Sequence, residues 1–298
     1  MSIINNAHPG SQIRLLCLID RVLIRRRKLA PISRQELIET CRPENLPNYE
    51  DGKKRFEDNL NFWLEEGLWA EHEGSIKVKD LKATEQDLPS RVLALCVKSH
   101  AEKDILLGNR IEPFLCTITA LLCHEQFSFQ GQQGGTQLLH TSADTAESIN
   151  NCLPSKLRIN LNEAPTIKKW GVFLGFLEPF GRGVITDPTR AITPILPELF
   201  VKNDTLQVRD FITALAERLP MLDGGKYRRV IEPLLEEKGW QAPLENRVST
   251  SLSHALLRFE AGFQLILDLP SDDSKSMALI STDGKKRFVG TVRYRESE

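Results

Sequence analysis

The feature that most constrains this chain is an apolar helical stripe that ends at a glycine and leads into a hairpin pattern, within residues 50–79. The residues that share the stripe are Phe56, Leu60, Trp63 and Leu64. Their spacing is that of one helix face, Gly67 is a helix stop, and Glu73-Gly74 is a tight-turn pair between two short alternating segments. We therefore predict a helix with one buried face followed by a two-stranded hairpin, with Leu60 near the centre of a small core.

Two shorter helix patterns precede this element. Ser11 has the position of an N-cap for a helix that ends in the basic residues 25–28. Ser33 with Glu36 forms a capping-box pattern for the second helix. The basic run has two readings, a solvated last turn in which cations suit the helix dipole or a patch that contacts phosphates. The order helix, short helix, longer helix and hairpin resembles the winged-helix superfamily, and this likeness indicates a fold rather than a function.

The winged-helix resemblance rests on residues 11–80 and above all on Leu60, Leu64, Gly67 and Leu68. In many members of the superfamily the third helix enters the major groove of DNA. The residues that should point outward from this helix are Lys54, Asp58, Asn61 and Glu65. Two carboxylates on that face would repel phosphates, which argues against strong DNA binding by the helix. The cations that could still hold a DNA backbone from the rim are Lys53, Lys54, Arg55 and Lys77.

Related patterns recur twice along the 298 residues. Residues 165–177 predict a second such helix, followed by a hairpin around Asp187-Pro188, and residues 249–260 predict a third. The three helix ends share one five-residue pattern, which is an apolar residue, any two residues, a glycine and a second apolar residue. The pattern occurs at residues 64–68, 172–176 and 259–263. The predicted fold is mainly α with small β-hairpins (α+β). It consists of tandem winged-helix domains over residues 1–84, 85–200 and 201–298, the second with extra helices and the third with a C-terminal β-meander.

Basic residues gather in the later domains. The second helix and its hairpin carry Lys168, Lys169, Arg182 and Arg190. The residues expected on the outward face of the third helix are Ser251, His254 and Arg258, without an acid among them. Residues 287–295 read as one strand with a largely basic face that contains Arg287, Arg293 and Arg295, next to Lys285 and Lys286. This C-terminal patch either binds nucleic acid or is a solvated edge strand that its charge protects from aggregation.

The overall charge does not favour DNA binding, because 39 Lys and Arg stand against 40 Asp and Glu, for a net charge of -1. The cysteines lack metal-binding spacing and read as reduced thiols. The glycine-rich residues 127–137 lack a phosphate-loop motif and read as a flexible connection. No cofactor, no metal and no catalytic residue is predicted. The longest apolar segment falls short of the roughly 20 residues of a membrane span, and with no signal-peptide pattern we expect a cytoplasmic protein.

In length and overall texture the chain also resembles the DpdG-like accessory proteins encoded in bacterial 7-deazaguanine DNA-modification and phage-defence islands. This resemblance implies a helicase or other ATPase as a partner and modified or foreign DNA as the context. We predict a non-enzymatic adaptor whose winged helices link protein partners, and possibly DNA, in such a complex. The alternative is a protein that binds double-stranded DNA directly, as a transcription regulator does, through the basic patches of the second and third domains. The near-neutral charge and the acidic residues on the first long helix favour the adaptor.

Overall fold

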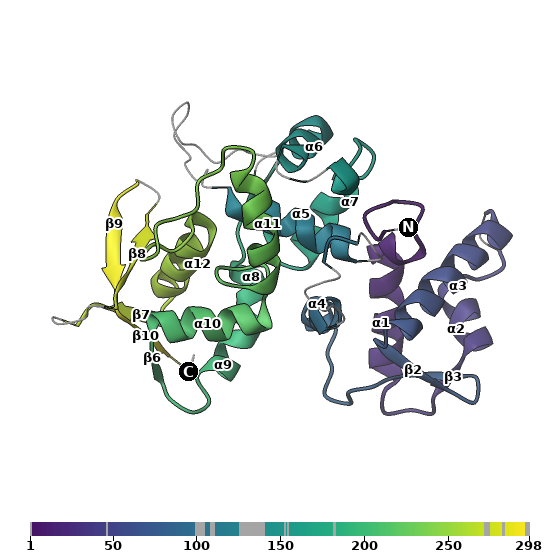
Figure 1. Ribbon diagram of the computed structural model, residues 1–298. Helices are drawn as coiled ribbons and strands as arrows, with labels where there is room; N and C mark the ends of the chain where they lie inside the picture. The colour runs from purple at the N-terminus through teal and green to yellow at the C-terminus, as the bar shows by residue number, and fades with distance from the viewer. Residues whose placement is uncertain are drawn as a thin grey trace. The chain divides into compact units, whose positions relative to one another are not determined.

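The computed structural model describes residues 2–45, 47–98, 105–107, 111–124, 141–151, 153, 155–180, 183–270, 275–281 and 284–295 (Figure 1). The chain forms two compact units, Met1–Ser99 and His100–Glu298. Both units are mainly helical and carry small antiparallel sheets, as the sequence predicts. The finer division into three winged-helix domains stays a prediction.

The helices of the first unit are the 3-10 helix η1 (Pro9–Ser11), α1 (Ile13–Arg26), α2 (Arg34–Cys41), α3 (Tyr49–Glu65) and α4 (Leu88–Lys98). Its strands β1 (Ile32–Ser33), β2 (Trp69–His72) and β3 (Ser75–Val78) form an antiparallel sheet in the order β1-β3-β2. The predicted cap of α2 is confirmed, because the Ser33 hydroxyl accepts a hydrogen bond from the Glu36 N–H at 3.1 Å. The predicted cap of α1 is wrong, because Ser11 lies in η1 and donates its hydroxyl to the Asn6 carbonyl, which leaves Gln12 at the N-cap.

The helix α3 buries the predicted stripe. Of the stripe residues, Phe56, Leu60 and Trp63 are each exposed by at most 1%. Leu64 is half-buried, at the edge of the stripe. The chain leaves the helix at Gly67, whose φ of 85° lies in the left-handed region that favours glycine. In the turn between β2 and β3, Glu73 and Gly74 have φ values of 51° and 72°, as a tight hairpin turn requires.

A buried ion pair fastens α4 to α1. Asp20 on α1 is 1% exposed, and its carboxylate accepts hydrogen bonds from the Arg91 guanidinium at 2.7 and 3.1 Å and from the Trp69 indole N–H at 3.0 Å. Burial opposes the charge of Arg91, but hydrogen bonds to Asp20 and Asp87 raise its pKa above the ordinary value. Three elements that are distant in sequence, α1, β2 and α4, are therefore joined by one polar cluster.

The second unit contains the helices α5 (Glu112–Cys123), α6 (Ser142–Asn150), η3 (Ser155–Leu157), α7 (Ala164–Phe173), α8 (Thr189–Ile192), η4 (Thr193–Ile195), α9 (Leu196–Leu199), α10 (Val208–Arg218), α11 (Lys226–Glu236) and α12 (Thr250–Ala261). Its strands are β4 (Leu177–Phe180), β5 (Gly183–Thr186), β6 (Thr205–Gln207), β7 (Leu265–Asp268), β8 (Met277–Ile280), β9 (Lys286–Val289) and β10 (Thr291–Tyr294). They pair as β4-β5, β8-β9 and β6-β10-β7. The sheet β6-β10-β7 has the same strand order as the sheet β1-β3-β2 of the first unit. In each sheet, the strand that comes last in the sequence lies between the other two and pairs with both.

The helix α5 is the centre of the second unit, and all of its residues are buried. Its last carbonyl groups are capped by side chains from α11, α12 and the segment between them. The Leu122 carbonyl accepts hydrogen bonds from Arg228 at 3.1 Å and from the Ser251 hydroxyl at 2.9 Å, and the Cys123 carbonyl accepts one from the Trp240 indole at 3.0 Å. A cation suits this end of a helix, so the buried Arg228 has a structural role.

The second hairpin does not lie where the sequence predicts it. Strands β4 and β5 pair from Leu177 with Thr186 to Phe180 with Gly183, so the hairpin ends before Asp187-Pro188. The Asp187 carboxylate instead accepts a hydrogen bond from the Thr189 N–H at 2.9 Å, at the start of α8. The prediction is wrong because an Asp-Pro pair can open a helix as well as form a turn.

The predicted C-terminal strand is interrupted at Gly290. The Gly290 N–H donates to the Asp268 carbonyl and its own carbonyl accepts from the Val208 N–H, both at 2.8 Å. The chain therefore changes sheets at this residue, with β9 paired to β8 and β10 paired to β6 and β7. A glycine within a strand pattern often marks such a break, and the expected single basic face does not exist.

Four helices end in the same backbone motif. The residue after the helix takes a left-handed conformation, and the next N–H bonds the carbonyl five residues back. At the ends of α3, α7 and α11 the left-handed residues are Gly67, Gly175 and Gly239, with φ values of 85°, 83° and 90°. At the end of α12 it is Phe263, with a φ of 59°. The third occurrence of the predicted pattern is thus out of step with the turn by one residue, because its glycine, Gly262, lies just before the left-handed position.

Candidate nucleic-acid interface

The outward face of α3 has mixed charge, as predicted. The predicted outward residues, Lys54, Asp58, Asn61 and Glu65, are all exposed. Arg34 at the start of α2 extends over this face, donating to the Asn61 side chain at 2.6 Å and pairing with Glu71 on β2 at 2.7 Å. The carboxylates and this engaged arginine leave little net positive charge where DNA would approach.

The predicted rim cations of the first unit lie at two separate places. Lys53, Lys54 and Arg55 follow one another near the start of α3, where Lys53 lies over the Tyr49 ring at 5.9 Å. Lys77 is exposed on β3, opposite Ala70 of β2. No ion pair is recorded for Lys54, Arg55 or Lys77 within the described part of the chain. Of the predicted rim cations of this unit, these three remain available to an anionic partner.

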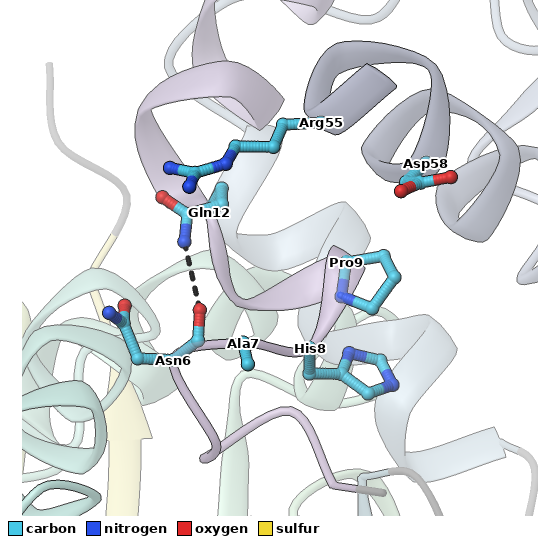
Figure 2. Close-up of a pocket in the computed structure, with 7 residues that line it drawn as sticks. All are labelled: Asn6, Ala7, His8, Pro9, Gln12, Arg55 and Asp58. Carbon is cyan, nitrogen blue, oxygen red and sulfur yellow. Dashed lines mark hydrogen bonds between the residues drawn. The ribbon is translucent and has the colours of Figure 1, made fainter. Parts of the chain in front are cut away.

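A polar hollow of about 340 Å³ lies between the start of the chain and α3 (Figure 2). Its lining residues are Asn6, Ala7, His8, Pro9, Gln12, Arg55 and Asp58. Figure 2 shows Arg55 directed toward Gln12, with Asp58 on the other side of the hollow. The wall is held in place because Asn59 of α3 donates to the Pro9 carbonyl at 2.7 Å and His8 packs edge-on against Phe62. With one cation and one anion, the hollow has no net charge that would attract phosphate.

The basic residues 25–28 are largely engaged within the first unit. Arg25 pairs with Glu85 and Arg26 with Glu36, each at 2.9 Å. Arg27 donates a hydrogen bond to the Ala83 carbonyl. Of the two readings of this run, these contacts favour the structural last turn over a phosphate-contacting patch.

Around α7 the predicted cations are also partly engaged. Arg190 donates to the Val172 carbonyl at 2.7 Å and lies 3.5 Å from the Glu178 carboxylate. Lys168 is half-buried and Lys169 is exposed. Arg182 lies outside the described residues, as does the whole of the glycine-rich segment 127–137.

The predicted outward face of α12 is wrong. Ser251 and His254 are buried, and α12 packs against α5, α8, β7 and β8 (Figure 1). Burial lowers the pKa of His254 to about 4, although Asp187 acts in the opposite direction. Arg258 is partly exposed, but its guanidinium pairs with the buried Asp187. The strands and helices that surround α12 therefore cover Ser251 and His254, and of the three residues expected on the outward face only Arg258 is exposed.

The C-terminal cations divide between two sheets. Arg287 on β9 forms two hydrogen bonds with the Glu260 carboxylate and donates to the Leu267 carbonyl at 2.8 Å. Its hydrogen bond to Glu260 raises the pKa of Arg287. Lys285 and Lys286 are exposed on the same hairpin, whereas Arg293 and Arg295 are exposed on or just after β10. For Lys286, Arg293 and Arg295, no ion pair is recorded among the residues that the structure describes.

A comparison with known protein families gives one match. The DpdG-like family model covers residues 1–273. The chain belongs to the DpdG-like family. No curated protein and no solved structure matches the chain.

Sequence reasoning missed the buried arginines of this DpdG-like chain. Arg228 is 1% exposed and pairs with Asp223 and Glu232, each at 3.1 Å. In the first unit, Arg91 pairs with Asp20. One signal was available, because Asp20 falls within the apolar stripe of α1, where an acid requires a buried partner.

The remaining chemistry predicted from the sequence concerns thiols and membranes. No disulfide joins the cysteines that the structure describes. Burial raises the pKa of Cys41 to about 11 and that of Cys96 to about 12, so these two thiols stay protonated at neutral pH. Cys152 lies outside the described residues. Across the described ranges there is no group of His, Cys, Asp and Glu that could hold a metal ion, and no helix is long and apolar enough to cross a membrane.

Proposed function

We propose that this DpdG-like chain is a non-enzymatic adaptor subunit of a bacterial DNA-processing, DNA-modification or phage-defence complex. Membership of the family supports the context. The strand orders β1-β3-β2 and β6-β10-β7, each next to a helix that ends in the same turn, support winged-helix-like units as the building blocks. The proposal gives the chain no catalytic residue and no cofactor.

The observation that carries the adaptor role is the internal neutralisation of three of the arginines predicted to contact DNA. Among the described residues, Arg190, Arg258 and Arg287 pair with acids of the same unit. Nonspecific affinity for DNA comes chiefly from cations that displace counterions from phosphates. An arginine already held by a carboxylate must lose that partner first, so each such pair subtracts from the affinity for DNA.

The partners that we propose are protein subunits, an ATPase or helicase among them. The test is purification of the tagged chain from its native host with and without nuclease, followed by identification of the retained proteins. Proteins that stay bound after nuclease treatment support the adaptor. If every partner is lost with the nucleic acid, the adaptor role is refuted and direct DNA binding takes its place.

A second candidate function, direct binding of double-stranded DNA, is favoured by the exposed cations without recorded ion pairs. Among the residues predicted to contact DNA, the described ones of this kind are Lys54, Arg55, Lys77, Lys169, Lys286, Arg293 and Arg295. If several of them neutralise phosphates, the affinity for a duplex should fall by orders of magnitude between low and moderate salt. A duplex affinity no better than that of an unrelated protein of similar charge rules this candidate out.

A further inference from the structure

The outer face of α1 carries a row of basic residues, which we call the α1 stripe. Its members are Arg14, Leu18, Arg21, Arg25 and, just after the helix, Lys28. They follow one another at alternating steps of four and three residues, so those inside the helix lie within about 60° of one another around its axis. The four basic residues are exposed and Leu18 is half-buried. Steps of four and three are the spacing with which a second helix packs along a first one.

The acids of the first unit neutralise only part of this charge. Asp20 is the one acid of α1, and it is buried and held by Arg91. Glu36 pairs with Arg26, which lies outside the stripe. Among the described residues, the acid recorded against the stripe is Glu85, in the segment before α4. One carboxylate therefore stands against four cations, and a partner would meet a row with net positive charge.

Glu85 shows how the α1 stripe holds a carboxylate. Its two oxygens accept hydrogen bonds from the Nε atoms of Arg21 and Arg25, each at 2.9 Å. The hydrogen bond from Arg25 is the largest of the effects that lower the pKa of Glu85. A guanidinium has five N–H donors, and no partner among the described residues is recorded for the terminal nitrogens of these two arginines. Their side chains stay 54% and 70% exposed, so both can bind a second carboxylate from outside.

The density of the cations fits an acidic helix better than a nucleic acid. From Arg14 to Arg25 the helix rises about 16 Å, and this length carries three arginines of the stripe. A duplex has one phosphate charge per about 1.7 Å of its axis, several times more than the stripe can match. A helix with one acid on each turn places about three carboxylates over the same length. Charges along such a seam also determine which helices pair.

We propose that the α1 stripe is the surface by which the first unit docks an acidic helix of a protein partner. The proposal rests on the adaptor function above and names a surface that it uses. The partner's carboxylates pair with the basic side chains, and Leu18 supplies an apolar contact within the seam. Because these pairs are exposed to solvent, binding should weaken as the salt concentration rises. Glu85 already occupies two of the arginines and therefore competes with the partner.

The probe is a labelled, alanine-based helical peptide with glutamates at alternating steps of four and three residues. Its binding to the full-length chain is measured by fluorescence anisotropy at low salt. The stripe variant combines Arg14→Gln with Arg25→Gln, and it should bind the peptide about fivefold more weakly or worse. The matched control combines Lys54→Gln with Lys77→Gln, which removes two exposed cations elsewhere in the same unit. It should bind as the wild type does.

A gain of affinity is expected from Glu85→Gln, because this change removes the competing carboxylate. The variant should bind the peptide about twofold to fivefold more tightly than the wild type, an effect that damage to the fold could not produce. A second peptide has the same composition with its glutamates distributed around the helix. Equal binding of the two peptides, or equal binding by the wild type and the stripe variant, would overturn the docking surface.

Two other occupants of the α1 stripe are tested with the same proteins. Binding to a DNA duplex and to vesicles that contain phosphatidylserine is measured for the wild type and the stripe variant. If the stripe variant loses affinity for either and keeps its affinity for the first peptide, the stripe serves nucleic acid or a membrane surface, and the proposal is wrong. Weaker peptide binding with unchanged values in both measurements supports it.

Purification from the native host after nuclease treatment separates this surface from the adaptor function. The stripe variant should lose a protein that the wild type retains. A variant that retains every protein of the wild type would overturn the docking surface and leave the adaptor function standing. A wild-type chain that retains no protein would overturn the adaptor function itself.

Discussion

The helices α3 and α12 share a local plan and differ in what covers them. Each is followed by a left-handed residue and a strand that belongs to a three-stranded sheet of the same order. The face of α3 that carries Asn61 is exposed, whereas the corresponding surface of α12 is covered by neighbouring helices and strands, and Ser251 is buried. The same helix and turn thus serve as an open surface in one unit and as part of the core in the other. The role of such a helix depends on its tertiary neighbours and not on its local pattern.

The largest expected difference between the two helices comes from adding a charge. Ser251→Asp places a carboxylate beside the Leu122 carbonyl in a buried site, and should lower the free energy of unfolding by about 3–5 kcal/mol. Asn61→Asp on α3 should change it by less than about 0.5 kcal/mol, because that position is exposed and the side chain still accepts from Arg34. Urea unfolding measures both. Similar losses at the two sites would contradict the burial of α12.

The second prediction tests the buried stripe of α3. Leu60→Ala should cost about 2–5 kcal/mol, because Leu60 is fully buried and alanine leaves a cavity. Leu64→Ala, at the half-buried edge of the same stripe, should cost clearly less. Denaturant melts of the two variants give the comparison. A larger loss at Leu64 would place the core on a different face of the helix.

The third prediction concerns the effect of pH on stability, and it applies to α12 but not to the outward face of α3. Burial lowers the pKa of His254 to about 4, so the folded state binds a proton at that site less readily than the unfolded state. Stability should therefore fall as the pH drops from about 6.5 to about 4, by up to about 3 kcal/mol from this residue. His254→Gln should show a shallower fall over the same window in unfolding measurements at several pH values. Identical slopes in the two proteins would mean that His254 is accessible to protons in the folded state.

The smallest predicted effects compare the turns at the two helix ends. Phe263→Gly should stabilise the chain by about 1 kcal/mol, because it removes a bulky residue from the left-handed region, even though glycine gains freedom in the unfolded state. Gly67→Ala should destabilise it by a similar amount or more, because its φ of 85° is strained for alanine. Thermal unfolding detects both changes. A loss of stability in Phe263→Gly would show that the ring is packed rather than exposed.

The sequence was sufficient for the first long helix and its hairpin, where local rules determine the structure. The stripe of α3, the stop at Gly67 and the Glu73-Gly74 turn depend on residues within one short segment, and the structure has all three. The mixed charge on the outward face of α3 follows from the same periodicity. These are the parts of the candidate interface that could be predicted.

Two of the predictions that failed depend on contacts between distant segments. The small polar residue Ser251 looks like a surface residue, but its hydroxyl caps the end of α5, 129 positions earlier in the chain. Arg287 looks like part of a basic strand, but the break at Gly290 and the pairing with Glu260 place it elsewhere. No periodicity within a helix or strand specifies which distant acid an arginine will find. The net availability of cations could therefore be judged only from the folded chain.

We propose that this DpdG-like chain holds duplex DNA only weakly and acts through protein partners, because Arg190, Arg258 and Arg287 are engaged by acids of their own unit. The most direct measurement is a salt titration of duplex binding by the full-length chain, with an unrelated protein of similar net charge as the reference. The account predicts weak binding close to that of the reference at every salt concentration. Clearly tighter binding that falls by orders of magnitude as salt rises would contradict it, because such a slope requires several cations on phosphates at once.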